Sequence, residues 1–250
     1  MTRMNEFRKN LARSYWAWRI YHVLVADAVA IQRPTKFRTV HEFLGDQLGI
    51  VGDIGCGPGV FTRHLSARAK QVLGADIDRE ALERVKARHQ DLENVAFVAA
   101  NADHLPLADE CLDTLLLLEV LEHLADDTGG LREMWRVLRP GGKIVLSVPV
   151  PPGEINEGAP WGHKREGYQL PEIMALLKKS GFRAENHAYA EFKFSRLAAS
   201  LIRKWRTSFH LPAPIFLSWV AYFDNLLDKK KTQAGNYLPA SVIILARKEE

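Results

Sequence analysis

Short apolar runs alternate with longer amphipathic stretches through the middle of this 250-residue chain. Short apolar runs bounded by turn residues are typical of buried strands, and apolar positions at three- and four-residue steps are typical of helices. The pattern predicts strands at residues 50–54, 71–76, 95–99, 113–118, 143–149, 183–190 and 240–248. It predicts helices at residues 59–69, 79–90, 119–125, 128–139 and 170–180.

The regular alternation of strands and helices is typical of a parallel sheet that is covered by helices on both faces. The end of the helix at 128–139 is marked by Pro140, which cannot continue a helix, and by Gly141, which can adopt the left-handed conformation. We therefore predict an α/β fold with a doubly wound sheet.

Charge is distributed unevenly along the chain. Residues 1–40 and residues 192–231 each carry a net charge of +6, and the overall charge of +4 then leaves −8 for the remainder. The first segment also places apolar and aromatic residues on one helical face: Phe7, Leu11, Tyr15, Trp18, His22, Val25 and Val29. These patterns predict four parts: a helical cap at 1–40, a core at 41–191, a helical insertion at 192–237, and a closing strand with the C-terminus at 238–250.

The chain contains only two cysteines, Cys56 and Cys111, without a zinc-type spacing of cysteine and histidine. Neither a disulfide framework nor a structural metal is therefore expected, and a reducing cytoplasm is the default location. No uncharged run reaches the roughly 18 residues that a membrane span needs. We expect a protein that is soluble or peripheral to a membrane.

The stretch GDIGCGPG at 52–59 packs four glycines into the turn from the first strand to the first helix, where open α/β sheets bind their ligands. A plain tight turn is the alternative. Asp76 ends the next strand about twenty residues later, where a carboxylate can accept hydrogen bonds from ribose hydroxyls. Together these features favour an adenosine-containing ligand. The dinucleotide frame needs glycine or alanine at its sixth position, but Val60 and Thr62 stand there, which disfavours a nicotinamide-dependent oxidoreductase.

The loop Asp53-x-Gly55-x-Gly57-x-Gly59 resembles that of class I S-adenosylmethionine-dependent methyltransferases. The strings NADHLPL at 101–107, CLDTLLLLEVLEHL at 111–124 and LREMWRVLRPGGKIVLSVP at 131–149 resemble further motifs of this family, in its branch that methylates quinones and other small molecules. The resemblance covers residues 41–190 and 238–248. It implies a Rossmann-like, mostly parallel seven-stranded sheet with an antiparallel last strand, and S-adenosylmethionine as the cofactor, with S-adenosylhomocysteine as its product.

The resemblance also implies which residues bind the cofactor. They are Asp53, Gly55, Cys56, Gly57, Gly59, Asp76, Ile77, Asn101, Ala102 and Glu119. Asn101 stands where the family has aspartate, and its side-chain carbonyl can still accept a hydrogen bond from the adenine amino group. Cys56 is interpreted as a small apolar residue. For Glu119, an ordinary acid at a helix N-terminus is the alternative.

Methyl transfer from a sulfonium requires mainly that a nucleophile be aligned for in-line attack. His123 follows the fourth strand and is the candidate general base, with a locally hydrogen-bonded helix histidine as the alternative. In the string at 161–182, His163, Arg165 and Tyr168 are candidates for contact with the acceptor. The alternative is an ordinary core stripe on which Tyr168 packs. No metal ligand is assigned.

The sequence therefore predicts a methyltransferase that acts on a small or lipid-like acceptor, at oxygen or carbon. The alternative is a methyltransferase-like protein that binds the cofactor or acts as a scaffold without transfer. The two basic segments predict either a lid over the acceptor or an interfacial element at anionic membranes. A nucleic-acid partner is disfavoured because no known RNA-binding module is present.

Overall fold

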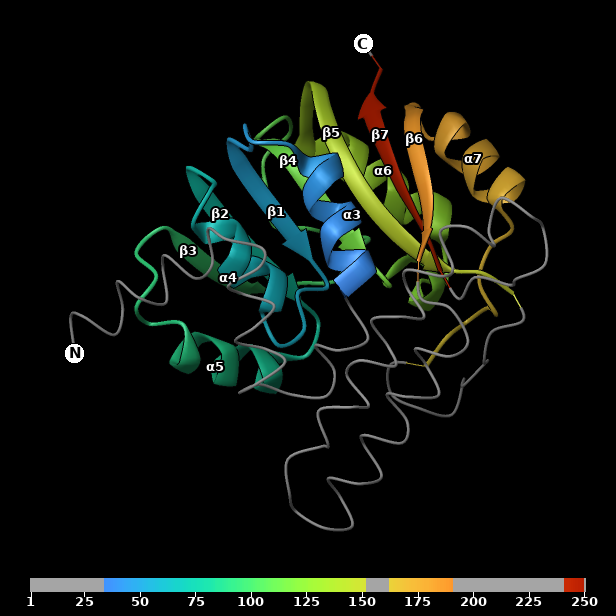
Figure 1. Ribbon diagram of the computed structural model, residues 1–250. Helices are drawn as coiled ribbons and strands as arrows, with labels where there is room; N and C mark the ends of the chain where they lie inside the picture. The colour runs from blue at the N-terminus through green and yellow to red at the C-terminus, as the bar shows by residue number, and fades with distance from the viewer. Residues whose placement is uncertain (1–33, 152–161, 191–240, 250) are drawn as a thin grey trace, which may run out of the picture.

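The computed structural model describes residues 34–151, 162–190 and 241–249 (Figure 1). The aromatic helical face predicted within residues 1–29 and the insertion predicted at 192–237 lie outside these residues.

A seven-stranded sheet forms the centre of the described part, with the order β3-β2-β1-β4-β5-β7-β6. The strands are β1 (Ile50–Ile54), β2 (Gln71–Asp76), β3 (Val95–Ala99), β4 (Leu112–Leu118), β5 (Leu138–Pro149), β6 (Phe182–Ala190) and β7 (Ser241–Lys248). Both pairings of β7, with β5 and with β6, are antiparallel, and the other pairings are parallel. The predicted doubly wound sheet with an antiparallel last strand is confirmed.

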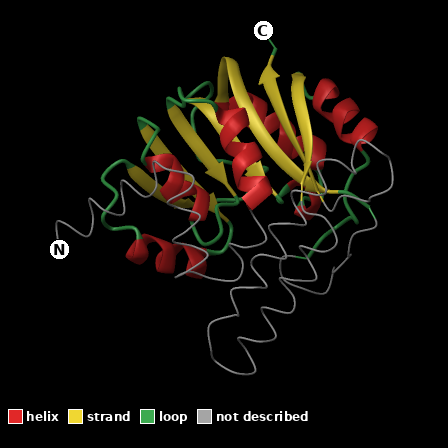
Figure 2. Cartoon of the chain, in the orientation of Figure 1, coloured by secondary structure: helices red, strands yellow, loops and turns green. Residues whose placement is uncertain are grey.

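Apolar side chains enter two cores because successive residues of a strand point to opposite faces of the sheet. In β4, Leu115 and Leu117 belong to one buried cluster and Leu116 to the other. The first cluster is completed by α6 (Asp127–Val137) and α7 (Leu170–Lys179), and the second by α3 (Pro34–Leu44) and α4 (Val60–Ser66). Helix α5 (Arg79–Arg88) lies against β3, and helices cover both faces (Figure 2). The nearly continuous apolar sequence of a strand such as β4 is thus explained by burial on both faces of the sheet.

Two of the predicted helices differ from the structure. The helix predicted at 119–125 is wrong, since Glu119 has a left-handed φ of 55° and only a single 3₁₀ turn, η2 (Leu121–His123), follows. The helix predicted at 128–139 ends at Val137, and β5 begins at Leu138. Gly141 does adopt a positive φ, of 71°, but within the first part of β5 rather than at the helix end.

The predicted boundary between the cap and the core, after residue 40, falls inside α3. This helix buries Phe37, Val40 and Leu44 against the sheet. Among the described residues, none of the helices combines the length and the apolar character needed to cross a membrane.

Candidate active site

The carboxyl ends of the parallel strands β1 to β4 meet at one edge of the sheet (Figure 1). The predicted cofactor residues lie in the last residues of these strands or directly after them. The loop after β1 holds Gly55, Gly57 and Gly59 at φ of 71°, 49° and 72°, values that favour glycine. A Cβ at Gly59 would lie 2.8 Å from Val85 Cγ1 and a Cβ at Gly55 only 2.3 Å from Val120 Cγ2. A Cβ at Gly57 would meet no described atom within 4 Å. Packing therefore explains two of the glycines, whereas no described residue packs against the Cβ position of Gly57.

Asp76 fixes the glycine loop from the neighbouring strand. Its carboxylate accepts hydrogen bonds from the backbone N–H of Gly57 at 2.8 Å and of Asp78 at 3.0 Å. A carboxylate offers about four acceptor positions, so two remain for a ligand. The next side chain, Ile77, is 44% exposed at the same edge.

Asp53, at the end of β1, is buried, and its carboxylate accepts a hydrogen bond from Thr62 Oγ1 at 2.5 Å. Burial raises the pKa of Asp53 to about 6, although the hydrogen bonds from Thr62 oppose the shift. Cys56 is also buried, and burial raises the pKa of its thiol far above the usual range. The thiol is therefore protonated at neutral pH, which fits the interpretation of Cys56 as a small apolar residue.

Asn101 and Ala102 follow β3 at the same edge. Asn101 is exposed and pairs with His104 in an isolated bridge, while Ala102 is buried in the core. The Asn101 side chain is accessible for a polar contact, and its neighbour anchors the turn.

Glu119, directly after β4, is held by two donors. Its Oε1 accepts hydrogen bonds from Lys36 Nζ at 2.6 Å and from Ser147 Oγ at 2.8 Å. Burial opposes its ionisation, but the Lys36 ammonium outweighs this effect and holds the pKa of Glu119 below its ordinary value. Lys36 was not identified from the sequence, because it lies 83 positions away on α3 and only the tertiary packing brings it here.

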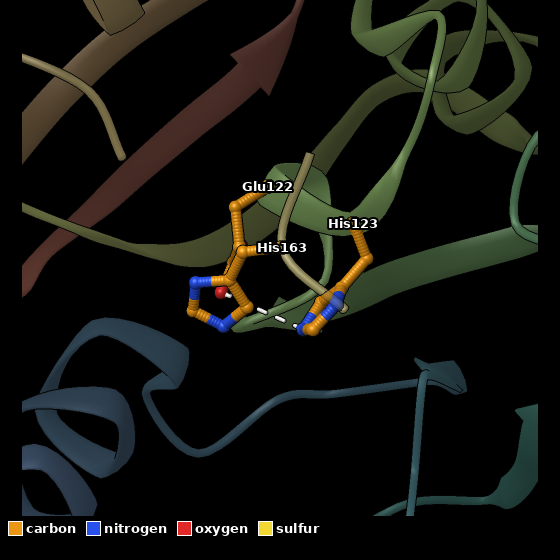
Figure 3. A group of neighbouring side chains, drawn as sticks. All are labelled: Glu122, His123 and His163. Atoms are coloured by element: carbon orange, nitrogen blue, oxygen red, sulfur yellow. Dashed lines mark ion pairs between the residues drawn. The ribbon is translucent and has the colours of Figure 1, made fainter. Parts of the chain in front are cut away.

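His123 and His163 come together although 40 positions separate them in the sequence. Their rings meet edge to face with centroids 4.6 Å apart, and His123 Nε2 lies 4.0 Å from Oε1 of Glu122 (Figure 3). Burial, followed by the charge of Glu119, raises the pKa of Glu122 to about 8. Glu122 was not identified from the sequence, although its position beside His123 in EVLEHL was a usable signal.

Arg165 and Tyr168 contact a different residue, Asp127 in the first turn of α6. Arg165 forms an ion pair with Asp127 at 2.9 Å, and the Tyr168 hydroxyl lies 3.1 Å from the same carboxylate oxygen. Tyr168 is fully buried and belongs to the core. Among the three candidates for acceptor contact, the structure brings only His163 to His123.

An open α/β sheet with a glycine loop and an acidic residue at the end of the second strand is typical of a nucleoside-binding class of protein. Residues 52–146 match the family model described as "Methyltransferase domain". The expected resemblance to class I S-adenosylmethionine-dependent methyltransferases is confirmed for this central stretch.

Two relatives and one solved structure illustrate the similarity. A protein of Mycolicibacterium smegmatis named "Probable S-adenosylmethionine-dependent methyltransferase" is 33% identical over 138 residues, which cover 54% of this chain and 52% of that protein. The demethylmenaquinone methyltransferase of Deinococcus radiodurans is 38% identical over 156 residues, covering 60% of this chain and 63% of that protein. The crystal structure of the [4+2]-cyclase SpnF shares the fold, with a TM-score of 0.60 and 22% identity over 88% of this chain and 82% of that chain. The chain thus spans about half to two thirds of the length of the curated relatives it matches here.

Proposed function

We propose that this chain binds S-adenosylmethionine at the carboxyl edge of β1 to β4 and transfers its methyl group to a small or lipid-like acceptor. The observation that carries the proposal is the contact between Asp76 and the Gly57 N–H, because it joins the acid assigned to the ribose to a loop glycine whose Cβ position meets no described atom within 4 Å. The methyltransferase domain match at residues 52–146 and the names of the relatives support it.

The described residues suit the chemistry of this cofactor. The spare acceptor positions of Asp76 suit the ribose hydroxyls, the exposed Ile77 suits the adenine face, and the accessible Asn101 carbonyl suits the adenine amino group. Glu119, held anionic by Lys36, suits a cationic amino group. When bound, the cofactor supplies a methyl group on a sulfonium leaving group.

This chain's residues would then act mainly by alignment. They hold the acceptor in line with the transferred methyl group and exclude water, which lowers the barrier by proximity. We place the acceptor beside His123 and His163, since these two residues lie beyond β4 at the same edge. The general-base role expected for His123 and the acceptor contact expected for Arg165 and Tyr168 stay predictions. Transfer to oxygen or carbon follows from the resemblance to quinone-type enzymes and is part of the proposal.

Calorimetry with S-adenosylhomocysteine tests the cofactor site. We expect the wild-type chain to bind it, and Asp76→Ala to lose about 2 kcal/mol of binding free energy or more, because a charged acceptor is removed. Glu80→Ala, which removes an exposed acid at the start of α5, is the matched control and should bind as the wild type does. Tight binding of NAD without any response to S-adenosylhomocysteine would contradict the assignment.

A second function, cofactor binding without methyl transfer, is favoured by one finding. SpnF has this fold and is named as a [4+2]-cyclase. Incubation with methyl-labelled S-adenosylmethionine and an extract of metabolites and lipids separates the two functions. A labelled product identifies the acceptor, and cofactor binding with no labelled product favours the second function.

The acceptor class is inferred from the basic, apolar segments at 1–40 and 192–237. A lipid-like acceptor predicts sedimentation of the chain with anionic vesicles but not with neutral ones, weakened by salt. The charge-neutralised variant Arg203→Gln, Lys204→Gln, Arg206→Gln should sediment less. If the chain stays in the supernatant at low salt, the acceptor is a soluble small molecule.

A further inference from the structure

Three potential metal ligands lie together beyond β4. Glu122, His123 and His163 each offer one ligand atom, and these atoms all lie within 4.8 Å of one another (Figure 3). Glu122 and His123 belong to the 3₁₀ turn η2, whereas His163 belongs to the segment that precedes α7. The combination is one carboxylate with two imidazoles.

The backbone holds the two segments in register. The N–H of Lys164 donates a hydrogen bond to the carbonyl oxygen of Glu122 at 2.8 Å, which fixes His163 beside η2. The imidazole rings of His123 and His163 then meet at 89°. The fold itself, rather than a chance contact of two surface side chains, creates this cluster.

The buried side chain of Glu122 lacks the partners that such a group normally has. Its residue is 0% exposed, and neither carboxylate oxygen has a hydrogen-bond partner among the described residues. Within the same part of the chain, Nδ1 of His163 is also buried without a hydrogen-bond partner. Buried polar groups are almost always satisfied, and a buried carboxylate needs a cation or several donors.

The neighbouring charged groups are engaged elsewhere. Glu119 is hydrogen-bonded to Lys36 and Ser147, and Arg165 is paired with Asp127. The Glu122 carboxylate itself forms an ion pair with His123 Nε2 at 4.0 Å. A positive charge at the centre of the cluster would satisfy the Glu122 carboxylate and Nδ1 of His163 together.

We propose that Glu122, His123 and His163 bind one divalent transition-metal ion of the Zn²⁺ type. Two imidazoles and one carboxylate are ligands that suit Zn²⁺ and its neighbours, whereas Mg²⁺ and Ca²⁺ take mainly oxygen ligands. Bonds of about 2.1 Å hold the ligand atoms of a tetrahedral ion roughly 3.4 Å apart. Side-chain rotations that bring the ligand atoms up to about 1.4 Å closer therefore complete the site.

Three protein ligands leave a fourth position on the ion, as in catalytic zinc sites. If the proposed function holds, this position faces the region assigned to the acceptor and takes an oxygen of the acceptor. The ion would then replace His123 as the group that favours the deprotonated acceptor, because a metal-bound imidazole nitrogen does not accept a proton. The same nitrogen of His123 therefore cannot both bind the ion and act as the general base.

Metal titration of the untagged, chelator-treated chain tests the proposal. We expect Zn²⁺ to bind with 1:1 stoichiometry in calorimetry, and Co²⁺ to give the visible absorption bands of a tetrahedral site. Glu122→Gln and His163→Ala should each weaken Zn²⁺ binding at least tenfold. His187→Ala, which removes an exposed histidine on β6, is the matched control and should leave the affinity unchanged.

Several outcomes overturn the proposal: no Zn²⁺ uptake, uptake that both ligand variants leave unchanged, or equally tight 1:1 binding of Mg²⁺. Glu122→Gln keeps the shape of the side chain, and His163→Ala provides a second variant if the first fails to fold. Binding of S-adenosylhomocysteine is measured on the same samples. Zn²⁺ uptake without S-adenosylhomocysteine binding would retain the metal site and remove the proposed function, and the reverse result would do the opposite.

Discussion

Asp53 shows how a single buried carboxylate can lower stability at neutral pH. Its pKa is about 6 in the folded chain, against 3.8 for an ordinary aspartate. Because the folded chain binds the proton more tightly, the stability that Asp53 contributes is fully present below pH 3.8 and is lost as the pH rises through about 6. Asp53→Asn retains an acceptor for Thr62 and removes the buried charge. We expect this variant to gain about 1 to 3 kcal/mol of unfolding free energy at pH 7.5 and nothing at pH 3.5.

Urea unfolding at the two pH values measures this difference. Asp46→Asn, at a fully exposed side chain, should show no gain at either pH. A variant that is less stable than the wild type at pH 7.5 would contradict the buried-charge explanation.

The contribution of Glu119 to stability changes with pH in the opposite direction to that of Asp53. Its pKa is lowered in the folded chain, so its contribution to stability is present above the unfolded pKa and is lost as the pH falls through the folded pKa. We expect Glu119→Gln to lose about 1 to 2 kcal/mol at pH 7, since the pair with Lys36 is only partly screened by solvent, and to match the wild type under acidic conditions. Glu83→Gln, in an exposed pair with Lys86, is the control and should change stability by less than about 0.5 kcal/mol. We therefore expect a pH-dependent loss of stability for Glu119→Gln but not for Glu83→Gln.

At the scale of the elements, the loop between β1 and α4 separates the packing role of glycine from its ligand role. Gly59→Ala combines a left-handed φ with a Cβ 2.8 Å from Val85, and we expect it to lose about 2 to 3 kcal/mol of stability. Gly57→Ala is strained only by its left-handed φ, and we expect it to lose about 1 kcal/mol of stability. Its methyl group would enter the space assigned to the cofactor, so we expect at least a tenfold loss of S-adenosylhomocysteine affinity. Thermal unfolding measures the stability of both variants, and calorimetry measures their affinity for S-adenosylhomocysteine. If Gly57→Ala and Gly59→Ala had equal effects on stability and on affinity, the separate roles of the two glycines would be contradicted.

The strands were predictable because burial on both faces makes them apolar along their whole length, as in Leu115 to Leu117. The turn after β4 was not, because its shape depends on the left-handed Glu119, whose carboxylate is fixed by Lys36 and Ser147 from other elements. The acids at the ends of β1 and β2, Asp53 and Asp76, were predictable from their spacing to the loop. The cluster of Glu122 with His163 was not, because it depends on the tertiary contact of Lys164 with η2.

At the scale of the whole molecule, the antiparallel strand β7 lies between β5 and β6 and makes the sheet continuous. Ala190, the last residue of β6, pairs directly with Ser241, the first residue of β7. The chain between them therefore begins and ends at neighbouring positions of one antiparallel pair. A two-residue Asn-Gly turn can join such strands.

We expect that residues 191–240 can be replaced by a short glycine-containing turn without loss of the fold. The sheet contacts of Ala190 and Ile243 belong to the described core. The variant should unfold cooperatively and bind S-adenosylhomocysteine as the full chain does, but it should lose turnover with the acceptor or sedimentation with anionic vesicles. Truncation after residue 240 is the matched control, and it should abolish folding because β5 and β6 lose their shared partner. Full acceptor turnover by the excised variant would show that acceptor recognition belongs to the sheet edge, at His123 and His163, rather than to the insertion.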